Sequence, residues 1–466
     1  MARLTFMGAT GGVTGSLYLL ETEQSKILLE CGLIQGSREE EKKNSEPFLF
    51  DPKSIDAVVL SHAHLDHSGR LPLLVKCGYR GPVYVTWATG DLLDIMLHDA
   101  ASLNMRDAEW ENKRRRRSGK EEVEPLYNDD DVRQTIKLFD RKKYGESFDV
   151  AQDINITYHD AGHILGSSIV EVTLSDTNPL RKLVFSGDLG NSCTALLRDP
   201  VRLSEANAVI MESTYGNRDH RSHDATLQEF EDILKEAAET GGNILIPSFA
   251  VGRTQELIFR LGEFYHKGSL SSQMVYLDSP MAIAATEVYH RYQNIFNTDD
   301  KNSILKSEAG TLHQFLPILR YSRTTEESVA LNNITHGAII IAGSGMCNGG
   351  RIRHHLKHNL WRRGSHVIIV GFQARNTPGL ALVDGASSLR LLGQDIVVNA
   401  KIHTLGGFSA HAGQQQLIDW VNGFNQARPK VYLVHGEDEA KATLRDKVEG
   451  AGFNVTIPYE NQVIDI

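Results

Sequence analysis

Three histidines and one aspartate crowd into Ser61–His67, a stretch that reads SHAHLDH. Imidazole nitrogens and carboxylate oxygens are the ligands that Zn²⁺ takes in catalytic sites. The crowded imidazoles would repel one another on protonation, and a bound metal removes that repulsion by holding them deprotonated. A polar loop that is rich in histidine by chance is the alternative, but chance rarely produces such a cluster. The stretch therefore predicts a metal site.

Short strands are expected to position this cluster. It directly follows Ala57–Leu60, an apolar run that predicts a buried strand. Earlier strands are expected over Leu4–Gly8, Ser16–Glu21 and Lys26–Gly32, which glycines separate. The last of them contains Glu30, whose carboxylate either orients a metal ligand or is simply a charge at a strand end.

Two later candidate residues, like the cluster, lie in turns at the ends of predicted strands. Strand patterns return at Ile154–Tyr158, Ile169–Leu174 and Leu183–Ser186. His163 lies between the first two, in GHILGS, and Asp188 follows the third, in SGDLG. Each side chain occupies a turn at a strand end with glycines beside it, so both become candidate metal ligands.

Residues 88–148 are helical in pattern and highly charged, and they contain the basic run Lys113–Arg117. Steering of phosphates is one interpretation of this run. A solvated, mobile connection between two helices is the interpretation that we favour.

From about residue 208, strands and helices alternate, which predicts a parallel sheet with ligand-binding loops at the carboxyl ends of its strands. One helix is expected to run from a cap at Ser222 to Gly241. The loop Gly343–Gly350 precedes a helix and either cradles phosphate with backbone N–H groups or serves only tight turns. The predicted strands of this region are Ala208–Met211, Asn243–Pro247, Met274–Leu277, Ala338–Ala342 and Val367–Val370. The tail, with strand patterns at Ile402–Leu405 and Val431–Val434, returns to the pattern of the first part of the chain.

Length and composition indicate a globular protein of two or three domains, since the chain has 466 residues. The four cysteines are isolated, with no CxxC pair, which favours a reducing compartment. No apolar run approaches the ~18 residues of a membrane span, and no signal-peptide core is present at the N-terminus. We therefore expect a cytoplasmic protein without a membrane partner. The net charge of −10 counts against a surface that coats nucleic acid, but metals can make one cleft positive.

Several motifs resemble those of a known superfamily. The pattern HxHxDH at residues 62–67, followed in order by His163, Asp188 and His435, resembles the dinuclear zinc site of the metallo-β-lactamase superfamily. Glu212 in ESTYG, His411 in GFSAHAG and His435 in LVHGE look like motifs A, B and C of its β-CASP branch. The segments PSFAVGRTQE, DSPMA, SGMCNGGRI and GFQA are also similar to stretches of that branch, which includes bacterial ribonucleases and the nuclease subunit of the pre-mRNA 3′-end cleavage complex.

The resemblance implies an α/β fold. A metallo-β-lactamase αββα sandwich would be built from residues 1–207 and 396–466, and a Rossmann-like β-CASP domain would be inserted as residues 208–395. The active site would lie in the cleft between these domains, a common location for ligand sites.

The resemblance also implies the ligand set and the reaction. His62, His64 and His163 would hold one zinc ion, Asp66, His67 and His435 a second, and Asp188 would bridge the two. The metals would provide a hydroxide near neutral pH that attacks the phosphodiester bonds of RNA. RNA is favoured over DNA because the RNA-acting branch has a histidine at motif C, as this chain has at His435. Asp66, Glu212 and His411 would be catalytic, and His411 beside the Glu212 carboxylate would donate a proton to the departing oxygen.

Substrate contacts are expected on the resembling stretches of the inserted domain and on the motif B segment, with a single-stranded segment of RNA as the partner. The oligomeric state is left open, a homodimer included. The residues expected to contact substrate are Ser248, Arg253, Ser344, Gly345, Arg351 and Ser409.

The chain departs from the family pattern at three positions. Glu30 stands where relatives usually have aspartate, Gly413 where they often have aspartate, and Leu380 where many have arginine. Gly413 removes one carboxylate that would orient His411, and Leu380 removes one cation that would contact phosphate. Two alternative functions share the same superfamily: a hydrolase of small thioesters or lactones, and a non-catalytic scaffold that partners an active relative.

Overall fold

The computed structural model describes residues 2–175, 180–192, 194–270, 273–306, 310–374 and 376–466. Internal contacts divide the chain into two compact units. Unit 1 comprises Met1–Ser192, Asp199–Asp219 and His411–Ile466, and unit 2 comprises Cys193–Arg198 and His220–Ala410.

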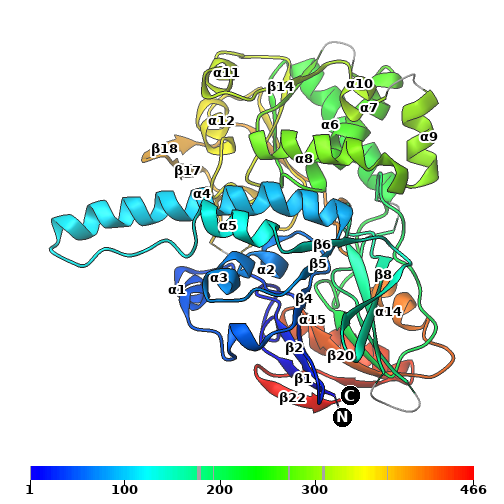
Figure 1. The fold of residues 1–466 in the computed structure, drawn as a ribbon. Coiled ribbons are helices and arrows are strands. Elements are labelled where there is room, and N and C mark those ends of the chain that lie inside the picture. Colours follow the sequence, from blue (N-terminus) through cyan, green and yellow to red (C-terminus); the bar gives the residue numbers. More distant parts are fainter. Residues whose placement is uncertain (1, 176–179, 193, 271–272, 307–309, 375) are drawn as a thin grey trace. The chain divides into compact units, whose positions relative to one another are not determined.

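The first sheet of unit 1 has seven strands and carries the histidine cluster. Its spatial order is β22 (Gln462–Asp465), β1 (Arg3–Phe6), β2 (Tyr18–Glu21), β3 (Lys26–Leu29), β4 (Ala57–Val59), β5 (Val83–Thr86) and β6 (Phe139–Lys142). The terminal strands β1 and β22 pair, and Figure 1 shows the two chain ends next to each other. All three residues of β4 are buried, and the strand lies parallel to β3 and β5. The cluster therefore starts from a fixed strand end.

The second sheet of unit 1 also has seven strands. Its spatial order is β21 (Asn454–Thr456), β20 (Lys430–Val434), β11 (Ala208–Glu212), β10 (Arg181–Phe185), β9 (Ser168–Leu174), β8 (Ile154–Asp160) and β7 (Ser147–Ala151). One apolar core lies between the two sheets, with Phe6 and Tyr18 from the first sheet and Phe185 and Tyr432 from the second.

Helices cover the outer faces of both sheets. In unit 1 they are α1 (Arg38–Lys42), α2 (Leu65–Ser68), α3 (Leu71–Lys76), α4 (Trp87–Arg117), α5 (Asp129–Ile136), α14 (Gln414–Val421) and α15 (Asp438–Gly450), with 3₁₀ turns η1 (Lys43–Ser45) and η2 (Pro52–Ser54). A second core joins α14 and α15 to the second sheet through Leu417, Leu444 and Val431. On the first sheet, α4 contacts β5 and β6. These layers confirm the predicted αββα sandwich.

The basic run Lys113–Arg117 is helical, which corrects its interpretation as a connection between helices. It forms the last turns of α4, and Figure 1 shows this end of α4 extending past α5. Ion pairs hold the turns together, since Lys113 lies 2.9 Å from Glu109 and Arg115 lies 3.0 Å from Glu111, each one turn earlier. Basic side chains at a helix C-terminus also interact favourably with the helix dipole. A second difference is that β6 is a strand within the stretch 88–148, because it pairs with β5.

Unit 2 contains a six-stranded parallel sheet. Its spatial order is β14 (Leu319–Tyr321), β13 (Met274–Leu277), β15 (Ala338–Ala342), β12 (Ile244–Pro247), β16 (His366–Ile369) and β19 (Lys401–Thr404). The central strands are wholly buried on both faces, as an all-parallel sheet covered by helices requires. This sheet confirms the predicted Rossmann-like architecture.

The helices of unit 2 follow the strand–helix alternation of the sequence. They are α6 (His223–Thr240), α7 (Arg253–His266), α8 (Pro280–Arg291), α9 (Thr298–Lys306), α10 (Leu312–Phe315), α11 (Thr325–Leu331), α12 (Ile352–Asn359) and α13 (Pro378–Val383), with the turn η3 (Gln293–Ile295) and the hairpin β17 (Ser388–Leu391) and β18 (Gln394–Val397). The Ser222 side chain accepts a hydrogen bond from the Ala225 N–H, and Gly241 ends α6 with a φ of 73°. None of the helices in the described part of the chain combines the length and the apolar character that a bilayer crossing requires.

The main segment of unit 2, His220–Ala410, begins and ends later in the chain than the predicted domain 208–395, and a short segment, Cys193–Arg198, precedes it. β11 pairs with β10 and β20, so it belongs to the second sheet of unit 1. β19 pairs with β16, so it belongs to the sheet of unit 2. Both strands were ambiguous in the sequence because their patterns show a strand but not which sheet it joins.

Candidate active site

Strand ends bring the candidate residues of unit 1 together. β10, β11 and β20 are parallel neighbours, so their carboxyl ends meet at one edge of the second sheet. Asp188 follows β10, Glu212 is the last residue of β11, and His435 follows β20. The histidine cluster reaches this edge from the end of β4 in the first sheet. All of these residues belong to unit 1.

One glycine allows the two loops to approach closely. Gly187 has a φ of 54°, and a Cβ added there would lie 2.7 Å from the Cβ of Ser61. A side chain at this position would therefore collide with the residue before His62 and would be strained in the left-handed region. Glycine lets Asp188 lie against the cluster.

The first group of candidate ligands surrounds a common point. His64 Nδ1 lies 3.1 Å from His62 Nε2 and 3.2 Å from His163 Nε2. Asp188 Oδ2 lies 3.5 Å from His62 Nε2 and 3.6 Å from His163 Nε2. Bonds of 2.0–2.1 Å to a tetrahedral zinc ion put its ligand atoms about 3.4 Å apart. The four residues fit one zinc ion.

The second group is formed by Asp66, His67 and His435. His67 Nε2 lies 3.2 Å from His435 Nε2, and Asp66 Oδ2 lies 3.8 Å and 3.5 Å from these two atoms. Asp188 Oδ2 lies 3.4 Å from His67 Nε2, so the same carboxylate oxygen adjoins both groups. Asp188 Oδ1 is buried and accepts no hydrogen bond within the described residues. A second ion shared through Asp188 fits this donor set.

The electrostatics of the site also favour a cation. Burial lowers the pKa of His62, and nearby imidazoles such as His67 lower it further, so that His62 is held neutral as a metal ligand must be. Burial would raise the pKa of Asp66, but His67 and His435 outweigh it and lower that pKa to about 2. At His67, the carboxylates of Asp188 and Asp66 outweigh burial and raise the pKa to about 10. The carboxylates of Asp66 and Asp188 therefore favour a positive charge at the site.

Outer contacts fix several of the imidazole rings. Ser61 Oγ lies 2.9 Å from His62 Nδ1, and Thr214 Oγ1 lies 3.1 Å from His435 Nδ1, so the opposite nitrogen of each ring faces the ligand groups. Sequence reasoning gave no role to Ser61 or Thr214, although both hydroxyls lie within motif segments. Glu30 is buried, which raises its pKa to about 7; its Oε1 accepts the Ser61 N–H, and its Oε2 lies 3.7 Å from His67 Nδ1. Glu30 therefore lies behind His67.

His411 and Glu212 form a pair beside the ligand groups. His411 Nδ1 lies 3.2 Å from Glu212 Oε2, and the backbone of His411 pairs with Gly190. Glu212 is almost fully buried and accepts the Leu189 N–H at 2.6 Å, which orients its carboxylate. Burial would lower the pKa of His411, but the Glu212 carboxylate outweighs it and raises that pKa to about 9. The pair can therefore hold a proton on an imidazole.

Gly413 and Leu380, two positions at which the chain differs from the family pattern, both lie at the start of a helix. Gly413 precedes α14, and its N–H is bound by Gln416 Oε1 at 2.9 Å. Leu380 is half-buried in the first turn of α13, where its N–H donates to Thr377 Oγ1.

The predicted substrate-binding residues all lie in unit 2. Ser248 is buried, and its hydroxyl accepts a hydrogen bond from Thr254. Arg253 is buried in an ion pair with Glu256, and Arg351 lies 2.7 Å from the Asp278 carboxylate. Ser344, Gly345 and Ser409 follow strands or precede His411 in loops. The two arginines are therefore held by internal carboxylates, which the sequence did not reveal.

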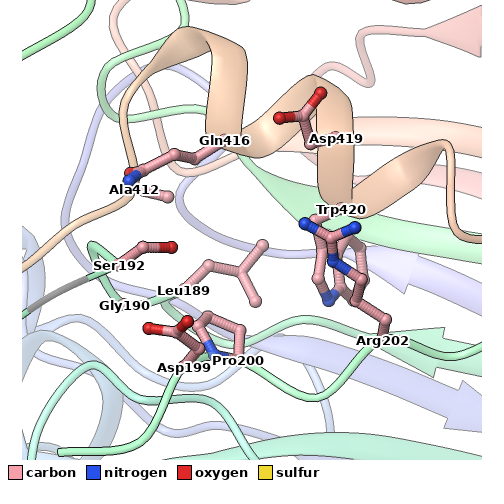
Figure 2. Close-up of a pocket in the computed structure, with 10 residues that line it drawn as sticks. All are labelled: Leu189, Gly190, Ser192, Asp199, Pro200, Arg202, Ala412, Gln416, Asp419 and Trp420. Carbon is pink, nitrogen blue, oxygen red and sulfur yellow. The ribbon is translucent and has the colours of Figure 1, made fainter.

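A small pocket is lined in part by Leu189 and Ala412, the residues that directly follow Asp188 and His411 in the sequence (Figure 2). It has a volume of about 100 Å³. Ligand pockets usually measure roughly 300–1,000 Å³, so we assign no ligand to it. It is lined by Leu189, Gly190, Ser192, Asp199, Pro200, Arg202, Ala412, Gln416, Asp419 and Trp420.

Comparisons with known proteins match this architecture. Family models described as "Metallo-beta-lactamase superfamily domain", "Beta-Casp domain" and "Zn-dependent metallo-hydrolase RNA specificity domain" match residues 19–191, 254–382 and 395–458. The chain is 40% identical over 456 residues to Ribonuclease TTHA0252 of Thermus thermophilus, covering 98% of both chains. The chain belongs to the β-CASP branch of the metallo-β-lactamase superfamily.

Other relatives carry a different name. This β-CASP chain is 32% identical over 463 residues to the "Transcription termination factor FttA" of Methanosarcina mazei, covering 96% of this chain and 68% of that relative. A solved structure, a protein of unknown function from Enterococcus faecalis, is similar in fold, with a TM-score of 0.54, 14% identity and 99% of each chain covered.

The charged network around Asp278 in the β-CASP insertion is expected to stabilise unit 2. Asp278 is buried and accepts from Ser328 Oγ at 2.7 Å, and it lies 2.6 Å from His355 Nε2. Burial would raise its pKa, but these partners and Arg351 outweigh burial and lower it to about 2. Because the folded pKa is below the ordinary value of 3.8, the network stabilises unit 2 above pH 4 and loses this contribution as the pH falls toward 2.

Asp278→Asn is expected to lower the opening free energy of unit 2 by roughly 2–4 kcal/mol at pH 7, because the buried His355 and the half-buried Arg351 lose their carboxylate partner. Hydrogen exchange at amides of β13 and β15 measures this difference, which should narrow below pH 4. Ser328→Ala, which removes one hydrogen bond, is the matched control and should cost about 1 kcal/mol. A difference between wild type and Asp278→Asn that stays constant down to pH 2.5 would contradict the assignment.

Proposed function

We propose that the protein is a zinc-dependent ribonuclease that hydrolyses phosphodiester bonds in single-stranded RNA. The observation that carries this proposal is the convergence of seven candidate ligands into two groups that share Asp188, with the His411–Glu212 pair beside them. The similarity to a ribonuclease over almost the whole chain supports the same activity. A cytoplasmic location, expected from the sequence, belongs to this proposal, and the oligomeric state is left open.

The two groups of ligands would hold two zinc ions. His62, His64 and His163 would hold one zinc ion, the second group would hold another, and Asp188 would contact both. Bound zinc would supply an activated water near neutral pH and neutralise charge at the phosphate. The hydroxyls of Ser61 and Thr214 would keep His62 and His435 in the tautomers that bind metal.

The metal ligands leave one requirement unmet, a proton for the departing ribose oxygen. His411 is 22% exposed at its side chain, whereas Glu212 is buried beneath it, so the imidazole is the member of the pair that can meet substrate. The Glu212 carboxylate favours the imidazolium form. We assign His411 as the general acid and Glu212 as the residue that orients it and keeps it protonated.

A paired assay separates this proposal from its alternatives. Purified protein is incubated with single-stranded RNA and, separately, with a set of thioesters and lactones. The proposal expects RNA cleavage that stops with a chelator and slow or no turnover of the small substrates. Turnover of the small substrates without RNA cleavage would identify a small-molecule hydrolase. Protein that binds no zinc and cleaves neither class would identify a scaffold.

The basic end of α4 is expected to contribute little to RNA binding. Lys113, Arg114, Arg115 and Arg116 all lie within 3.5 Å of glutamates on the same helix or on the loop that follows it. Replacing arginines 114–117 with serine should therefore leave both the affinity for RNA and its salt dependence nearly unchanged. Fluorescence anisotropy at several salt concentrations measures both. A salt slope lower by about 0.7 for each arginine would show that they contact phosphate.

A further inference from the structure

The sheet of unit 2 has a ligand-binding edge that is defined by its topology. From β12 the chain moves to β13 and β14 on one side, and from β15 it moves to β16 and β19 on the other. In open parallel sheets, ligands bind outside the carboxyl ends of the strands, at the point where the direction of winding reverses. Here the loops that follow β12, β15 and β16 occupy that point.

Two arginines near these loops, Arg253 and Arg351, are paired with carboxylates of the same unit. The Arg253 side chain is 7% exposed and paired with Glu256. Arg351 pairs with Asp278 and donates to the Ser322 carbonyl oxygen at 3.1 Å. These guanidinium groups are committed to the unit itself. Any ligand that meets the described part of this edge therefore finds other side chains first.

Phe249 is the prominent exposed side chain at this edge. It follows β12 and leaves 46% of its surface exposed, although it lies against two other loops. A Cβ added at Gly345 would lie 2.9 Å from Cδ2 and Cε2 of Phe249, and one added at Gly371 would lie 3.9 Å from Cε2. A side chain at Gly345 would displace the ring. The ring is thus positioned by glycines on one side while much of it stays open to solvent.

A second exposed ring lies on a neighbouring loop. Phe372 follows Gly371, at the end of β16, and is 51% exposed. Gln373 ties this loop to the loop after β15, because its Nε2 donates to the Gly345 carbonyl oxygen at 3.0 Å. Single exposed apolar residues are ordinary on protein surfaces. Here, however, two exposed aromatic rings lie on loops at the carboxyl ends of the strands, and a hydrogen bond links two of these loops.

We propose that Phe249 and Phe372 form a stacking platform that binds an unpaired base of the RNA substrate. This inference rests on the proposed ribonuclease function and adds to it a mode of substrate recognition. Aromatic rings bind single-stranded nucleic acid by stacking, which tolerates any base because every base has a π-face. The platform would therefore require an unpaired nucleotide in the substrate, without selecting its identity.

The test is a scan with abasic nucleotides. A set of single-stranded RNAs, each lacking one base at a different position, is cleaved by wild type and by Phe249→Leu, which keeps apolar volume but removes the ring. For wild type, removal of one particular base should raise KM by roughly 5- to 150-fold, the usual range for one stacked base. Phe249→Leu should show a similar rise on intact RNA and no additional sensitivity at that position. Phe249→Tyr should restore the wild-type profile.

Controls separate this inference from the function on which it rests. Trp361→Ala removes another exposed ring of unit 2, which follows α12 rather than a strand end, and should leave KM unchanged. All variants should retain the zinc content of wild type. A Phe249→Leu profile that keeps the wild-type sensitivity to the missing base would overturn the platform while leaving the ribonuclease intact. If wild type cleaves no RNA at all, the proposed function itself fails.

Discussion

Asp188→Ala is expected to lose most of its bound zinc and to cleave RNA roughly 10⁴-fold or more slowly than wild type, because without metal the pKa of water returns from about 7 toward 15.7. The physical reason is that Asp188 Oδ2 lies within 3.6 Å of ring nitrogens in both ligand groups. Removing this carboxylate also leaves the buried imidazoles without their shared negative charge. Elemental analysis of the purified variant and a time course of RNA cleavage measure the two effects.

His435→Ala is the matched comparison for Asp188→Ala. Of the two ligand groups of the proposal, His435 is part of the second, so its loss should lower zinc content by about one ion and leave the first group occupied. Asp188→Ala should therefore carry less zinc than His435→Ala. Equal zinc content in wild type and Asp188→Ala would reject the shared position of this carboxylate.

His411→Ala is expected to retain zinc and yet to cleave RNA roughly 10²–10⁴-fold more slowly, the usual range for removal of an acid–base group. His411 completes neither of the two ligand groups of the proposal, and its Nδ1 faces the Glu212 carboxylate. Glu212→Gln should show a smaller loss, because it leaves the imidazole in place but removes the charge that keeps it protonated. Zinc analysis and cleavage rates on the same preparations separate the two properties.

The leaving group decides between acid catalysis and simple binding of phosphate by a cation. In an RNA with a phosphorothiolate at the cleaved bond, sulfur replaces the departing oxygen. The leaving group then departs as a thiolate, which needs no proton. His411→Ala should lose much less activity on this substrate than on ordinary RNA. Equal losses on both substrates would assign His411 to phosphate binding, and full activity on ordinary RNA would end its assignment altogether.

Much of the framework was predictable because the strands are short apolar runs bounded by glycine and polar residues. The predicted strands Met274–Leu277 and Ala338–Ala342 coincide with β13 and β15. Helix α6 begins after Ser222 and ends at Gly241, since both residues have local capping roles that do not depend on the rest of the fold. Sheet membership, in contrast, depends on partners distant in sequence, and so β11 and β19 could not be assigned from their patterns.

The candidate site divides in a similar way. The cluster at residues 62–67 was evident because four potential ligands within six positions leave little alternative, whereas His163 and Asp188 each gained meaning only from their turn at a strand end. Thr214 and Phe249 were not recognised, because a hydroxyl behind an imidazole and a ring resting on glycines depend on side-chain packing. The commitment of Arg351 to Asp278 was hidden for the same reason, since the two residues are far apart in the sequence.

The most direct test is a titration of metal-free protein with zinc, in which bound zinc and cleavage of end-labelled RNA are measured in the same samples. The proposal of two ions that share Asp188 expects no cleavage without zinc and full activity only as bound zinc approaches two ions per chain. Cleavage of RNA by protein shown to contain no zinc, or zinc-loaded protein that leaves RNA intact, would contradict it.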